Sequence, residues 1–166
     1  MPENKAMRKR PRRSEEQLSK IIEHLGYEFQ MLNHTAVVLA TLPPILLHES
    51  IKNALMESFT VHARNLLGFL WDLTPWDDDV IASDFFDDQS TWDDNPPTIP
   101  PILEPLDGRV GKEVAHLTYA RIGISPEDKQ WHFLEMAKAL NGCFFEFISR
   151  APKARLGELS KLKPSA

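Results

Sequence analysis

The sequence predicts an all-α protein: a four-helix bundle with a long acidic, proline-rich loop between helices 2 and 3. Two observations predict it. Apolar residues recur at intervals of three and four along several long segments, as on the buried face of a helix. No segment alternates apolar and polar residues cleanly over five or more positions, as a half-buried strand does. The length of 166 residues and a hydrophobic fraction of 42% fit one globular domain.

The first helix is expected from Glu15 to about Leu42. Ser14 and Gln17 can form a capping box, and Pro43-Pro44 ends the helix because proline lacks an N–H group. Its apolar positions are Leu18, Ile21, Ile22, Leu25, Phe29, Leu32 and Val37. The second helix is expected over about 49–71, ending before Thr74-Pro75.

The segment 76–101 holds eight aspartates and four prolines, a composition that excludes a long helix. Within it, residues 80–86 are expected to form one short helical turn, with Phe85 and Phe86 packing onto the bundle. The third helix is expected from about Pro101 to Arg121, with Gly123 as its C-cap. The fourth begins at Ser125-Pro126, a capping serine followed by proline at the first helical position, and runs to about residue 149.

Charge is uneven along the chain. Residues 1–13 carry a net charge of +5 and residues 150–166 one of +4, so with a total of −5 the domain between them carries −14. We expect a basic disordered tail at 1–13, a helical domain at 14–149 and a basic flexible tail at 150–166. The alternative role for these tails is contact with nucleic-acid phosphates.

No secretory signal is expected, because no continuous apolar segment follows the basic N-terminus. The longest apolar stretch, residues 36–47, is broken by two prolines and is too short to span a membrane. The single cysteine, Cys143, lies in an apolar run and is expected to be a buried thiol. We therefore expect a cytoplasmic protein with no membrane contact and no cofactor.

The second helix carries polar side chains on two neighbouring arcs: Asn53, Glu57 and Arg64 on one, and Ser58, His62 and Asn65 on the other. Together with Glu113, we take Glu57, His62, Arg64 and Asn65 as candidate binding residues. The alternative is a hydrogen-bonded network that fixes the register of the helices, with Glu57 and Arg64 as an ion pair.

On the third helix, Arg109, Glu113 and His116 are expected on one face, because spacings of four, three and seven return to the same side. A guanidinium can hold a phosphate while an imidazole moves a proton. Arg109 and His116 are therefore the candidate catalytic residues.

Residues 54–67 (ALMESFTVHARNLL) and 109–119 (RVGKEVAHLTY) resemble a widespread set of small uncharacterised bacterial helical proteins. Their layout also resembles the HEPN (higher-eukaryote/prokaryote nucleotide-binding) superfamily, in which an arginine, four to six residues and a histidine mark a metal-independent ribonuclease site. The six residues between Arg109 and His116 match that spacing. The superfamily usually has a polar residue after the arginine; here Val110 stands there, which leaves a binding-only relative as an alternative.

The resemblance implies a homodimer that joins two copies of the motif over RNA, and a toxin paired with an antitoxin-like protein. His116 would move the proton of the ribose 2′-hydroxyl or of the leaving oxygen, and Arg109 would stabilise the phosphate charge.

Three other interpretations stay open. His34, His62 and His116 come from three expected helices and could hold a metal, although no helix carries a His-x-x-x-His pair. The four tryptophans, at positions 71, 76, 92 and 131, are expected to anchor core and loops, with an aromatic pocket wall as the alternative. The last is a non-catalytic helical module that binds a partner or a ligand through the edge of helices two and three.

Overall fold

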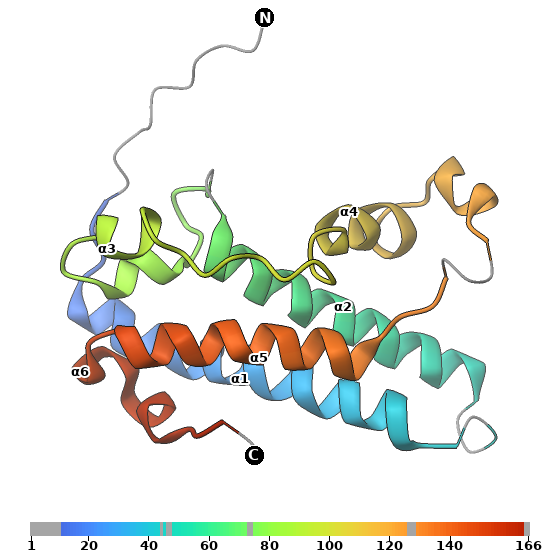
Figure 1. Cartoon of the computed structure of the whole chain (residues 1–166), viewed down its shortest axis with the longest axis horizontal. Coiled ribbons are helices and arrows are strands. Elements are labelled where there is room, and N and C mark those ends of the chain that lie inside the picture. Colours follow the sequence, from blue (N-terminus) through green and yellow to red (C-terminus); the bar gives the residue numbers. More distant parts are fainter. Residues whose placement is uncertain (1–10, 44, 46–47, 73–74, 126–128, 165–166) are drawn as a thin grey trace, which may run out of the picture.

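The computed structural model describes residues 11–43, 45, 48–72, 75–125 and 129–164, and over these residues the chain is helical with no strand. Three long helices form the body: α1 (Glu15–Thr41), α2 (Glu49–Trp71) and α5 (Phe133–Arg150). They lie side by side, and the shorter elements cover one side of α2 and one end of the body (Figure 1). The predicted all-α class is confirmed.

The first two helices begin and end where the sequence predicts. The capping box of α1 is formed: the Gln17 backbone N–H donates to Ser14 Oγ at 3.2 Å, and the Ser14 N–H donates to Gln17 Oε1 at 2.9 Å. His48 caps α2, its ring Nδ1 accepting from the Ser50 N–H at 3.3 Å. Both helices therefore have their first turns fixed by side chains that precede them.

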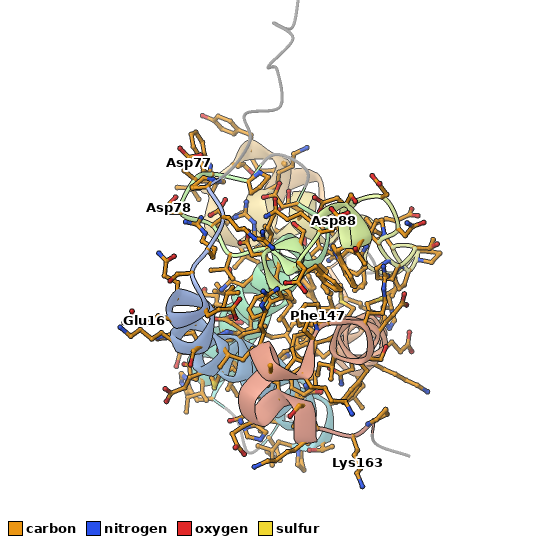
Figure 2. The ribbon with its side chains drawn as sticks, turned by 90° about the vertical axis from the view of Figure 1, so that its left-hand side faces the viewer. Glu16, Asp77, Asp78, Asp88, Phe147 and Lys163 are labelled. Atoms are coloured by element: carbon orange, nitrogen blue, oxygen red, sulfur yellow. The ribbon has the colours of Figure 1, made fainter. Side chains whose placement is uncertain are left out.

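Phenylalanines fill the space between the long helices. Phe147 of α5 stands at the centre of the cluster (Figure 2). Its ring is perpendicular to that of Phe69 of α2, and the ring centroids are 4.9 Å apart. Phe29 of α1 stacks on Phe144 at 4.6 Å. Cys143 lies in the same core, so the predicted buried thiol is confirmed. The core thus joins all three long helices.

The acidic loop packs onto this core through two short helices, η2 (Ala82–Phe85) and α3 (Ser90–Asp93). Phe85 and Phe86 are buried, as predicted. The loop is also tied to the start of α1, because the Arg13 guanidinium donates to the carbonyls of Asp77 and Asp79. Asp77, Asp78 and Asp88 lie at the surface (Figure 2). Asp84 is buried instead, and its Oδ2 accepts from the Ile81 N–H at 3.3 Å.

The predicted third helix is wrong in its bounds. Over 101–121 the structure has α4 (Leu106–Arg109), which continues into a π-helix, η3 (Val110–Ala115), and then a separate 3₁₀ helix, η4 (Tyr119–Gly123). The chain is extended at His116, with φ −116° and ψ 141°. Apolar spacing alone could not show this break. A π-helix is defined by backbone hydrogen bonds to the residue five positions earlier, such as the bond from the His116 N–H to the Gly111 carbonyl, and not by the order of apolar residues.

The fourth helix also begins later than predicted. Its predicted first residues, 126–128, lie outside the described residues, and α5 starts only at Phe133. Trp131, expected inside that helix, precedes it and lies under the guanidinium of Arg109.

Within the predicted flexible tail at 150–166, residues 153–161 pack on α1 instead. They form α6 (Lys153–Leu156) and η5 (Gly157–Lys161), with Leu156 and Leu159 buried in the core. Arg155 holds them there by donating to both carboxylate oxygens of Glu15 at 2.5–3.1 Å and to Asp87 Oδ1 at 2.8 Å. The hydrogen bond from Arg155 lowers the pKa of Glu15. The sequence signal for this packing was the apolar residues Leu156 and Leu159, which a count of the basic residues does not reveal.

Residues 1–10 of the other predicted tail lie outside the described residues.

Candidate functional site

The polar arcs of α2 face two different neighbours. His62 Nδ1 lies 2.7 Å from Glu28 Oε2 of α1, and Asn65 Nδ2 donates to the same oxygen at 3.0 Å. Arg64 points the other way and its Nε donates to Asp107 Oδ1 of α4 at 2.7 Å. Three of the four candidate binding residues of this helix are therefore divided between the α1 and α4 contacts.

The first contact is a partly buried polar cluster, here called the Glu28 cluster (Glu28, His62 and Asn65). His62 is only 8% exposed, and its ring stands edge-on to that of Tyr27 at 5.5 Å. Glu28 was missed by sequence reasoning. The signal was its position, three residues after Leu25 and four before Leu32, which puts an acidic side chain on the buried face of α1.

Glu57, predicted to pair with Arg64, is exposed on α2, and Arg64 pairs with Asp107 instead. The reason is that α4 lies against this side of α2 and presents a nearer carboxylate. Asn53 is exposed as well.

Arg109 and Glu113 come together as predicted. The Arg109 guanidinium donates from Nε to Glu113 Oε1 at 2.9 Å and from Nη2 to Oε2 at 3.1 Å. It also donates to the Gln130 carbonyl at 3.3 Å and lies 4.0 Å from the centre of the Trp131 ring. Both side chains of the ion pair are largely covered. Arg109 therefore joins η3 to the segment that leads into α5.

His116 does not share that face, because the helix has ended at Ala115 and the side chain is exposed. It begins a projecting segment, here called the arm (residues 116–123), which extends from the body beside α4 (Figure 1). The arm presents Leu117, Tyr119 and Ile122 at exposed fractions of 94%, 93% and 82%. Sequence reasoning missed this feature because it expected one helix to continue to about Arg121.

The described residues contain no group of three or more His, Cys, Asp or Glu side chains that could hold a metal ion. His34 is exposed on α1, His62 is bonded to Glu28 and His116 lies on the arm, so the three histidines do not converge. Among the helices that the structure describes, none is long and apolar enough to cross a membrane.

The chain matches no family model, no curated protein and no solved structure. The function has to be inferred from the contacts of the chain itself.

Proposed function

We propose that this chain is a helical interaction protein that pairs with a second copy of itself through the arm. The observation that carries the proposal is the exposure of Leu117, Tyr119 and Ile122 within six residues. Scattered apolar side chains on a surface are ordinary, but large ones gathered on one projection are typical of an association site. Two copies of one such surface are self-complementary across a twofold axis.

The arm is held in shape by hydrogen bonds within it and to η3. Thr118 Oγ1 donates to the Lys112 carbonyl at 2.8 Å, and Arg121 Nη2 donates to the carbonyls of Val114 and His116 at 3.0 and 2.8 Å. These bonds fix the turn without covering its apolar side chains. A surface that is already ordered loses less conformational entropy when it binds.

The arm is small, and its small contact area limits the strength of the pairing. Three large side chains from each copy bury an area at the small end of specific interfaces. The dimer is therefore expected to dissociate on dilution.

Sedimentation velocity over a range of protein concentrations tests this proposal. The wild type should shift from monomer to dimer as concentration rises, and the double variant Leu117→Ser/Ile122→Ser should remain monomeric at every concentration. Val37→Ser is the matched control, because Val37 is a half-exposed apolar residue on α1. A wild type that stays monomeric contradicts pairing, and a dimer that survives in the double variant contradicts the arm as its site.

A second candidate function is the metal-independent RNA cleavage implied by the HEPN resemblance. The observation that favours it is the position of His116, exposed and directly before Leu117, so that pairing through the arm would bring the histidines of two copies toward one another. Arg109 lies seven residues earlier in each copy, as the resemblance requires. On this proposal α4 and η3 take the place of the third helix of the bundle. The protein acts in the cytoplasm, its substrate is RNA, and its partner is an antitoxin-like protein.

Glu113 gives the sharpest test of this second candidate, because it occupies the guanidinium that would have to hold a phosphate. Glu113→Gln weakens that pair and should raise cleavage of a single-stranded RNA, while His116→Ala should abolish both cleavage and any growth arrest on expression. His34→Ala is the control, since His34 is exposed on α1. Absence of cleavage and of growth arrest in both the wild type and Glu113→Gln rejects the ribonuclease and leaves the interaction protein.

A further inference from the structure

The ends of α1 and α2 that face their connection project beyond the core. The buried residues of α1 end at Ala36, and those of α2 begin at Phe59. α5 packs on both helices, but it has 18 residues where α1 has 27. At a rise of about 1.5 Å per residue, α5 is shorter than α1 by about 13 Å. The end of α1 and the start of α2 therefore extend past the helix that covers the rest of them (Figure 1).

This projecting end exposes apolar side chains. It is here called the hairpin tip (Leu42, Ile45, Glu49, Ile51 and Lys52). Ile45 is 92% exposed, Ile51 52% and Leu42 41%. Ile51 precedes the buried Phe59 by eight residues, slightly more than two turns, so both lie on one side of α2. The core-facing stripe of α2 thus continues into the tip, where α5 and the other described elements leave it uncovered.

The start of α2 gains stability from a cover. No residue of 49–58 is buried, although the segment is helical throughout. Helices in proteins are stabilised mainly by the packing of their apolar face rather than by helix propensity. An apolar side chain from another molecule on Ile51 would supply that packing.

The charges of the hairpin tip fit a second copy of the chain. Glu49 and Lys52 are exposed and lie on either side of Ile51 in sequence. A patch on a twofold axis faces its own copy, so a patch of one charge sign would repel itself. A patch with both signs can instead pair Glu49 of each copy with Lys52 of the other.

The hairpin tip and the arm lie at the same end of the long axis of the molecule, and α3 of the acidic loop lies at the other end (Figure 1). Copies that pair through their arms meet at this end, where one twofold axis can bring both arms and both tips together. Leu42, Ile45 and Ile51 would double the number of large apolar side chains in a contact that is otherwise small.

We propose that the hairpin tips of two copies pack against each other as a second contact of the dimer. This inference rests on the proposed pairing through the arm and adds a surface to it. Ile45 and Ile51 supply apolar area, and the pairs of Glu49 with Lys52 fix the register. Two helical hairpins that meet in this way form a four-helix contact.

The apolar part is tested by sedimentation velocity on Ile45→Ser/Ile51→Ser. Dimerisation should weaken by about tenfold, the change expected when a large apolar side chain is lost from an interface. The circular dichroism of the monomer should not change, because both side chains are exposed. Val61→Ser is the matched control, since Val61 is 49% exposed on the same helix and lies outside the tip. An unchanged dissociation constant in the double variant overturns the tip contact.

The charged part is tested by exchanging the signs. Glu49→Lys and Lys52→Glu each place like charges opposite one another, so each variant alone should dimerise about threefold more weakly. An equimolar mixture of the two should recover the wild-type affinity, because the mixed dimer again joins opposite charges. A mixture of Lys52→Glu with Glu23→Lys, changed at an exposed position of α1, should not recover it. Absence of recovery in the first mixture overturns the assigned register.

The tip contact and the pairing through the arm fail in different ways. A dimer that is lost in Leu117→Ser/Ile122→Ser and unchanged in Ile45→Ser/Ile51→Ser overturns the tip contact alone. A dimer that is unchanged in the arm variant overturns the pairing through the arm, on which the tip contact rests. A wild type that is monomeric at every concentration overturns both.

Discussion

The Glu28 cluster and the arm each contain a histidine that the sequence marks as a candidate, and the two are used in opposite ways. His62 lies inside a helix of 23 residues, is covered by α1 and is bonded to a carboxylate. His116 lies where a π-helix has just ended, is exposed and stands beside apolar side chains that nothing in the described chain covers. The histidine of the long helix is thus used in packing, whereas the segment that follows the π-helix leaves His116 and its apolar neighbours exposed.

The largest expected loss of stability comes from a change in the phenylalanine core between the long helices. Phe147→Ala should lower the free energy of unfolding by about 3–5 kcal/mol, because the deleted ring leaves a cavity between rings on all sides. Leu117→Ala should change it by less than about 0.5 kcal/mol in the monomer, because the side chain packs on nothing there. Urea unfolding at low protein concentration measures both. A large loss in Leu117→Ala would mean that the arm is part of the fold.

Glu28→Ala should have a smaller effect, a loss of about 1–3 kcal/mol, because it leaves the buried His62 ring nitrogen and the Asn65 amide without their partner. Glu23→Ala, exposed on the same helix, is the control and should cost little. A double-mutant cycle of Glu28→Ala with His62→Ala measures the coupling directly. Additive losses would show that the contact does not stabilise the protein.

The smallest expected effect is on the pH dependence of stability, and it comes from the contact between the C-terminal segment and the start of α1. The hydrogen bond from Arg155 holds the pKa of Glu15 below its ordinary value of 4.5. A carboxylate with a lowered pKa in the folded state contributes stability above its ordinary pKa, and that contribution is lost as the pH falls through the folded value. Wild type should therefore lose a small part of its stability on acidification below pH 4.5 that Arg155→Met does not lose. Parallel acid profiles of melting temperature would contradict the contact.

The sequence predicted the regions in which local signals agree. The capping box at Ser14 and the prolines after Leu42 fixed α1, and two phenylalanines in an acidic loop were enough to predict that the loop packs on the core. Where a polar residue interrupted an apolar stripe, its role depended on the neighbouring helix: Glu28 and Asp107, the partners of His62 and Arg64, lie 34 and 43 residues away in sequence.

The third segment could not be predicted because its π-helix spans only 6 residues, too few for the apolar spacing of i→i+5 bonding to be told from that of an α-helix. The predicted face of Arg109, Glu113 and His116 holds for the first two, which are four residues apart, and is lost at the third, where the chain becomes extended. Whether Arg109 and His116 act together on RNA stays a prediction.

Cysteine cross-linking tests the pairing of the arms most directly. Leu117→Cys, Tyr119→Cys and Ile122→Cys are oxidised in separate samples, with Val37→Cys as the control. The native Cys143 does not compete, because it is buried and burial raises the pKa of its thiol. Two cysteines form a disulfide only when their Cβ atoms approach to about 3.5–4.5 Å. Pairing through the arm predicts a covalent dimer in at least one arm variant and little in Val37→Cys; equal yields in all four variants would contradict it.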